Sequence, residues 1–158
     1  MTRIDEKVWV GDSDDGHLKD NPEFSAVLNV AHDLEGVLSW PEVEYMQVGL
    51  VDGPGNEVIT YCAAIVALVA LTQKHDKILM YDHNGGRALA VALMYLTVLE
   101  GKIVKRVGNP TLFPHRRRGW EEHIFDLRTK HTGKLPDSNA AHVAAFYKIP
   151  YDILEVLL

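Results

Sequence analysis

The sequence predicts an α/β fold in a single domain, with a central, mostly parallel sheet flanked by helices. Short β-branched or apolar runs, bounded by Gly, Asp, Asn or Pro, alternate with longer apolar stretches of helical spacing. A chain of 158 residues has the length of one domain, and 47% of it is apolar, which is enough to bury a sizeable core. No internal repeat or low-complexity tract divides it, so we take residues 1–158 as one domain.

Four segments have the length and composition of strands. They are short and apolar or β-branched, and turn-forming residues bound them. These segments are KVWVG from Lys7, AVLNVA from Ala26, EYMQVGLV from Glu44 and KILMY from Lys77.

Two helices are predicted around the fourth strand. In NEVITYCAAIVALVALTQKH, which precedes it, Val58, Cys62, Ile65 and Val69 recur at helical spacing. The segment from Arg87 to Glu100, which follows it, is apolar on almost every side, so we expect that helix to be buried all round.

The last third of the chain gives a coarser pattern. Ser138 is a suitable N-cap, and Pro150 interrupts a helix. We expect helices over 117–130 and 138–147, followed by a short element over 151–158. The basic cluster from His115 to Arg118 suits the solvated start of a helix, or contact with an acidic or phosphorylated partner.

Charge, cysteine content and apolar run length exclude several classes of protein. The net charge of -6 argues against a general nucleic-acid binder, which needs a basic face. The single cysteine, Cys62, excludes an internal disulfide framework and suits a reducing compartment. The charged N-terminal residues lack the pattern of a signal peptide, and the apolar runs are shorter than the roughly 20 residues of a membrane span. We therefore predict a cytoplasmic protein that binds neither nucleic acid nor membrane; the oligomeric state stays open.

The turn after the fourth strand has the features of an anion-binding loop. A strand that enters a helix through a glycine-bearing turn presents backbone amides and the helix dipole to one point. Gly85 and Gly86 permit close backbone approach, and Arg87 has the planar fork that holds two phosphate oxygens. A glycine pair alone fits an ordinary turn with a surface arginine better than an anion site. The predicted phosphate-binding loop comprises Tyr81, Asp82, His83, Asn84, Gly85, Gly86 and Arg87.

Residues 4–102 resemble the dual-specificity branch of the protein tyrosine phosphatases. KVWVG is similar to that family's opening strand, FSAVLNVAHDLEG to its second strand and turn, EYMQVGLVDGPGNEVITY to its general-acid segment, and KILMYDHNGGRALAVALMYLTVLEGK to its signature loop and helix. The resemblance implies a protein tyrosine phosphatase-like fold; residues 103–158 lie beyond it. The family motif is HCxxGxxR followed by Ser or Thr, in which the cysteine is the nucleophile and the arginine binds phosphoryl oxygens.

The loop departs from that motif in two possible registers. If the strand sets the register, Tyr81 falls on the family's histidine and Asp82 on its cysteine, and the loop is one residue short before Arg87. If Arg87 sets it, Tyr81 falls on the cysteine and Met80 on the histidine. Neither register supplies a thiol, and Ala88 stands where the family has a hydroxyl.

Two residues are candidates to replace the missing nucleophile. Cys62 lies in an apolar helix, which disfavours a reactive thiolate, so we expect it to be buried packing. Asp82 would need a metal ion to offset its repulsion of phosphate, and no second carboxylate lies near it in sequence. Asp82 instead has the position to pair with Arg87 and fill the site internally.

The resemblance assigns the general acid to Asp52, which stands after a strand and before a Gly-Pro-Gly turn. An aspartate before glycine is also a common turn residue. With Asp82 and Arg87, it completes the predicted catalytic positions.

No cofactor or metal is predicted. Asp12, Asp14 and Glu23 have calcium-loop spacing, but Gly16 falls one place too early, so we interpret this segment as a solvated acidic loop. The eight histidines lack zinc-site spacing, and only His83 lies in the predicted loop.

Three functions remain open on these residues. The first is a pseudophosphatase, catalytically impaired, that binds a protein partner, phosphorylated or not, as a binding or scaffold module. The second is an active phosphatase acting on phosphotyrosine, phosphoserine or phosphothreonine with a non-cysteine nucleophile. The third is a structural partner-binding domain whose old site is filled by Tyr81 and Asp82.

Overall fold

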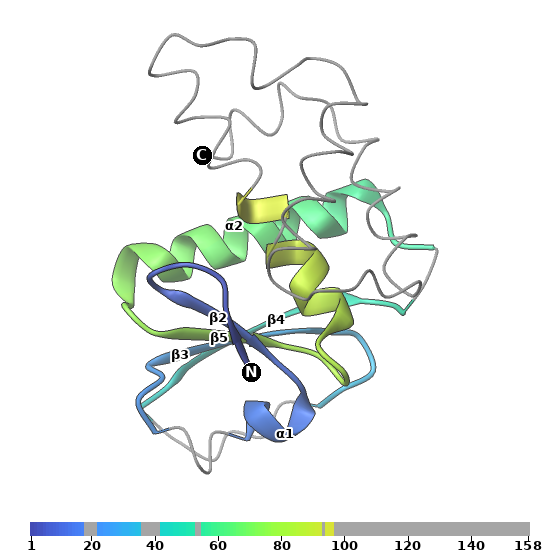
Figure 1. Cartoon of the computed structure of the whole chain (residues 1–158). Coiled ribbons are helices and arrows are strands. Elements are labelled where there is room, and N and C mark those ends of the chain that lie inside the picture. Colours follow the sequence, from blue (N-terminus) through green and yellow to red (C-terminus); the bar gives the residue numbers. More distant parts are fainter. Residues whose placement is uncertain (18–21, 36–41, 53–54, 93, 97–158) are drawn as a thin grey trace, which may run out of the picture.

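A computed structural model describes residues 1–17, 22–35, 42–52, 55–92 and 94–96 of the chain (Figure 1). Its sheet has the strand order β1-β2-β5-β3-β4. Strands β2, β5, β3 and β4 are mutually parallel, whereas β1 pairs antiparallel with β2 at one edge. The bounds are β1 Thr2–Arg3, β2 Val8–Gly11, β3 Ala26–Ala31, β4 Glu44–Leu50 and β5 Ile78–Tyr81.

All four predicted strands are confirmed. The prediction missed β1, because two residues are too short to show the alternation of apolar and polar side chains that marks a strand.

The helices follow the predicted order. Helix α2 spans Val58–Lys74, and residues 86–92 and 94–96, after β5, are helical as well. The second of these was predicted to begin at Arg87 and begins one residue earlier. Its side chains at 87–92 and 94–96 are all buried, as predicted.

The prediction that the acidic segment after β2 is a solvated loop is wrong in part, because the segment contains a short helix, α1 Ser13–Gly16. The Asp12 carboxylate accepts the N–H groups of Asp14 and Asp15, both at 3.0 Å. The Asp15 carboxylate accepts the Asp12 N–H at 3.2 Å, which completes a capping box. These acidic side chains therefore start a helical turn directly after the end of β2.

The two faces of the sheet are covered unequally. Figure 1 shows α2 lying across one face and α1 on the opposite side. On β5, Ile78 and Met80 belong to the large core shared with α2 and the helix from Gly86, whereas Leu79 and Tyr81 belong to a smaller cluster with Phe24 and Val27. This alternation is that of a strand buried on both faces.

Several predictions fall outside the described residues. They are the helices over 117–130 and 138–147, the element over 151–158, the basic cluster from His115 to Arg118, and the whole of 103–158 as part of the domain. Within the described part of the chain, α2 and the other helices are too short or too polar to cross a membrane.

Candidate functional site

Three strands end at the same edge of the sheet and bring their following residues to Arg87. Because β3, β4 and β5 are parallel, their carboxyl ends lie together. Asp82 follows β5, Asp33 lies two residues beyond β3, and Leu50 ends β4. All three accept hydrogen bonds from Arg87.

Asp82 forms a two-point contact with Arg87. Its Oδ2 accepts the Arg87 backbone N–H at 3.0 Å and the Nε–H at 3.1 Å. Both side chains are buried, with 4% of Arg87 and 1% of Asp82 exposed. The second oxygen, Asp82 Oδ1, is buried and has no hydrogen-bond partner among the residues that the structure describes. The pairing of Asp82 with Arg87 that the sequence suggested is therefore present.

The outer end of the guanidinium is also occupied. Arg87 Nη1 donates to Asp33 Oδ1 at 3.0 Å and to the Leu50 carbonyl at 2.7 Å. The hydrogen bond from Arg87 is the main reason that the pKa of Asp33 is lowered, with a smaller contribution from the nearby His83. His83 Nε2 lies 3.3 Å from the other oxygen of Asp33. Two carboxylates thus face one cation.

The glycine pair has unequal roles. Gly85 has φ of +81°, in the left-handed region, and a Cβ there would lie 3.3 Å from the Gly11 carbonyl oxygen. Glycine is therefore strongly favoured at 85. Gly86 has no such φ; its N–H donates to Asn84 Oδ1 at 3.0 Å.

The first amides of the helix are already bound. The Gly86 N–H is bound by Asn84 and the Arg87 N–H by Asp82, both through side chains of the same loop. The N–H groups at a helix start are the ones an anion would use. In this loop, side-chain oxygens of the protein occupy these two.

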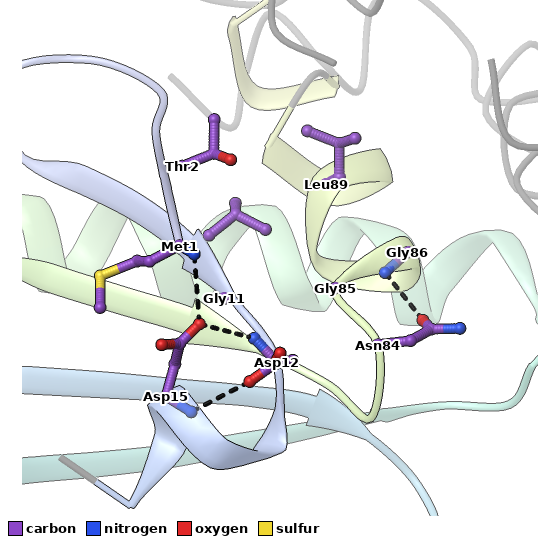
Figure 2. Close-up of a pocket in the computed structure, with 10 residues that line it drawn as sticks. Met1, Thr2, Gly11, Asp12, Asp15, Asn84, Gly85, Gly86 and Leu89 are labelled. Atoms are coloured by element: carbon purple, nitrogen blue, oxygen red, sulfur yellow. Dashed lines mark hydrogen bonds and ion pairs between the residues drawn. The ribbon is translucent and has the colours of Figure 1, made fainter. Parts of the chain in front are cut away.

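A cavity of about 260 Å³ borders the other side of the loop (Figure 2). Arg87, Asp82 and Asp33 do not line it, whereas Asp12 and Asp15 do. Asp15 Oδ2 also lies 3.4 Å from the amino group of Met1. A phosphate in this cavity would meet two carboxylates, which lowers its affinity. The cavity is lined by Met1, Thr2, Val10, Gly11, Asp12, Asp15, Asn84, Gly85, Gly86 and Leu89.

Tyr81 lies on the opposite face of the sheet from Arg87. Its ring packs with Phe24 and Leu79, and a Cβ on Gly16 would come within 2.5 Å of it. Burial, and then the neighbouring Tyr45, raise the pKa of the Tyr81 phenol well above its usual range. The prediction that Tyr81 helps to fill the loop is wrong, because strand alternation turns it away from its neighbour Asp82.

Asp52 is exposed and lies two residues beyond Leu50. The loop that carries it is held by Asn56, which accepts the Val51 N–H and donates to the Val51 carbonyl, both at 2.8 Å. Leu50 contacts Arg87, so the loop begins beside the site. The general-acid role of Asp52 stays a prediction.

Cys62 is confirmed as buried packing. It lies in α2 with 5% of its surface exposed and belongs to the large core. Burial raises the pKa of its thiol, which disfavours the reactive thiolate.

Asp33 is the site residue that the sequence reasoning missed. It is 54 positions from Arg87, but it follows a predicted parallel strand, and the ends of such strands meet at one edge. That rule, applied to AHDLEG, would have placed it beside Asp82. Despite this second carboxylate, the described residues include no cluster of three or more His, Cys, Asp or Glu suited to a metal ion.

None of the known protein-family models and none of the curated proteins matches the sequence. Solved structures do match the fold. The OH1 tyrosine phosphatase from the Orf virus has a TM-score of 0.62 at 17% identity, covering 99% of this chain and 86% of its own. A mouse putative dual specificity phosphatase, complexed with zinc tungstate, has a TM-score of 0.67 at 17% identity, covering 96% and 87%.

The Yvh1 phosphatase domain from Chaetomium thermophilum has a TM-score of 0.67 at 12% identity, covering 92% of this chain and 91% of its own. At identities this low, the structural likeness establishes the fold alone. The chain has the fold of the dual-specificity and tyrosine phosphatases, as the sequence resemblance predicted.

Proposed function

We propose that this phosphatase-like module is catalytically impaired, a pseudophosphatase that acts as a scaffold for a protein partner. The observation that carries the proposal is the occupation of Arg87. Its guanidinium donates through Nε to Asp82 and through Nη1 to Asp33 and the Leu50 carbonyl, which leaves fewer of its N–H groups for phosphoryl oxygens. Oxygens of the protein itself thus compete with phosphate for Arg87, which supports an impaired site.

Phosphoryl transfer also needs a nucleophile, and the candidates are unsuited to it. Asp82 is 1% exposed, and the oxygen that faces Arg87 already accepts two hydrogen bonds. Its negative charge repels an incoming phosphate unless a cation offsets the repulsion. Arg87 cannot supply that offset while Asp33 and Asp82 both neutralise it. Cys62 is buried in α2.

The electrostatics of the loop support a partner that does not need phosphate at Arg87. One cation faces two carboxylates there, and the adjoining cavity adds Asp12 and Asp15. A phosphorylated partner would have to displace Asp82 from a buried contact, which is costly. We therefore propose a protein partner that binds the folded surface, and we assign the protein to the cytoplasm, which suits its single buried cysteine.

Two measurements on the full chain test this function. The first is hydrolysis of an aryl phosphate, with and without added divalent metal, compared with Arg87→Ala. The second is the thermal midpoint with and without inorganic phosphate, for the wild type and for Asp33→Asn/Asp82→Asn. The double variant keeps amide acceptors for Arg87 but removes both negative charges.

We expect no hydrolysis above the Arg87→Ala background and no phosphate-dependent shift in the wild type. The double variant should gain about 3 °C when phosphate exceeds its dissociation constant about tenfold. Wild-type hydrolysis that is lost in Arg87→Ala would identify an active phosphatase. Stabilisation of the wild type by phosphate that is absent in Arg87→Ala would identify a module that binds phosphate through Arg87.

A further inference from the structure

A second polar cluster lies at the amino ends of the parallel strands, at the opposite edge of the sheet from Arg87. In it, hydrogen bonds connect a hydroxyl to an imidazole and the imidazole to a carboxylate. Ser25 Oγ lies 3.0 Å from His75 Nδ1, and His75 Nε2 lies 2.7 Å from Glu44 Oε2. Ser25 precedes β3, Glu44 begins β4 and His75 follows α2. A six-residue strand separates this edge from the Arg87 site by about 20 Å.

Backbone hydrogen bonds fix all three residues. The Ser25 N–H donates to the Lys77 carbonyl at 3.1 Å, and the Glu44 N–H donates to the Ser25 carbonyl at 3.1 Å. The His75 N–H donates to the Leu71 carbonyl at 2.9 Å, at the end of α2. The cluster is therefore held by strands and a helix, which favours a defined side-chain geometry.

The charges assign the proton positions. Hydrogen bonds from His75, then from Lys74, lower the pKa of Glu44, so its carboxylate is ionised at neutral pH and only accepts. His75 Nε2 must then carry the proton in the 2.7 Å contact. In the neutral ring, Nδ1 is left as an acceptor for the Ser25 hydroxyl. The alternative acceptor for that hydroxyl, the Lys77 carbonyl, is farther away at 3.4 Å.

We propose that Ser25, His75 and Glu44 form a nucleophilic serine site that hydrolyses small carboxylic esters. A nucleophile bonded to a base, which a third group orients, is the arrangement that activates serine. Ser25 is exposed, and 17% of the His75 side chain is exposed. This activity is separate from the proposed scaffold function and uses none of the residues around Arg87.

The reaction has two balanced steps. The Ser25 oxygen forms a bond to the ester carbonyl carbon while its proton passes to His75 Nδ1. The bond from that carbon to the leaving oxygen breaks, and the leaving alcohol takes the proton from His75. Water then forms a bond to the acyl carbon and gives a proton to His75 Nδ1. The bond from that carbon to the Ser25 oxygen breaks, the Ser25 oxygen takes the proton back from His75, and the carboxylic acid leaves.

Lys74 brings a positive charge to the cluster. Its Nζ lies 3.3 Å from Glu44 Oε1, and 64% of its side chain is exposed. We assign it the role of offsetting the negative charge that develops on the carbonyl oxygen. Glu44 is a positioning residue, because it acts through His75 and not on the ester.

The test uses the folded full chain and a fluorophosphonate probe, which reacts with activated serines. Peptide mass spectrometry locates the adduct. Ser13 provides an internal control, because its hydroxyl contacts the His83 carbonyl at 3.4 Å and not a base. We expect an adduct on Ser25 at a rate at least about 100-fold above that on Ser13, the scale of general-base assistance.

Two variants separate catalysis from structure. His75→Ala should slow Ser25 labelling and hydrolysis of p-nitrophenyl acetate about 100-fold, and added imidazole should restore part of the rate. Ser25→Ala should remove the adduct and the burst of p-nitrophenol. Equal labelling of Ser13 and Ser25 in the wild type would overturn the proposal, even if the His75 variant failed to fold. Labelling of Ser25 that persists in folded His75→Ala would overturn it as well.

Discussion

Polar groups are buried to different extents at the carboxyl ends of the parallel strands, the carboxyl edge, and at their amino ends, the amino edge. At the carboxyl edge, Arg87 and Asp82 are almost fully buried and bind each other, so their charges are used within the protein. At the amino edge, Ser25, His75 and Glu44 are aligned by hydrogen bonds of similar length, but Ser25 is exposed and the side chains of His75 and Glu44 are 17% and 36% exposed. Burial, more than residue type, decides which edge is available for chemistry.

The same difference sets the energetics of the two edges. A buried ion pair is costly to break, because the remaining partner is left charged and away from water. An exposed pair contributes little, because water screens it and replaces the lost contact. We therefore expect substitutions at the carboxyl edge to change the stability of the fold, and substitutions at the amino edge to leave it largely intact.

The largest effect is expected for Asp82→Ala. It leaves the Arg87 Nε–H and backbone N–H without their acceptor in a buried place. Loss of one partner of a buried pair costs about 3–5 kcal/mol, and we expect about 3 because Asp33 still contacts the guanidinium. Chemical denaturation of the wild type and the variant gives the difference in the free energy of unfolding.

Asp33→Ala is the matched control, because it removes the other carboxylate from the same cation. Asp33 is 60% exposed, so its loss should cost less than about 1 kcal/mol. If the two variants lose equal stability, burial does not distinguish the two contacts.

A smaller effect is expected for Gly85→Ala. The residue has φ of +81°, where an alanine costs about 1–2 kcal/mol, and its Cβ would also approach Gly11. Gly86→Ala is the control within the same pair, since Gly86 lies in the first turn of the helix without a positive φ. It should stay within about 0.5 kcal/mol of the wild type. Thermal or chemical unfolding that ranks them in the reverse order would contradict the strained loop.

The sequence predicted the fold well where local signals were strong. The strands at Ala26 and Glu44 begin where predicted, because turn residues flank apolar runs of strand length. Helix α1 was missed because calcium-loop spacing and helix capping both use closely spaced acidic residues.

The candidate site was predictable only within one loop. Asp82 and Arg87 are five residues apart, so their pairing followed from the loop alone. Asp33 and the Ser25 cluster depend on strand pairing, which brings together hydrogen-bonded residues that are 31 to 54 positions apart. The error at Tyr81 was avoidable: once Asp82 is assigned to the site, the preceding strand residue must face the other way.

The smallest effect concerns pH, at one exposed carboxylate on each edge. In the folded state the pKa of Glu44 is lowered from 4.5 by His75 and Lys74, and that of Asp33 is lowered from 3.8 by Arg87. A lowered folded-state pKa means that the carboxylate stabilises the fold above its unfolded value and loses this contribution as the pH falls through the folded value. Each carboxylate should therefore lose its contribution to the stability of the fold in acid, below about pH 4.5 for Glu44 and below about pH 3.8 for Asp33.

The free energy of unfolding, measured across this range, should be less pH-dependent in Glu44→Gln and in Asp33→Asn than in the wild type. An unchanged pH dependence in Glu44→Gln would show that its contact with His75 does not hold the carboxylate ionised, and would remove the orienting group from the serine cluster.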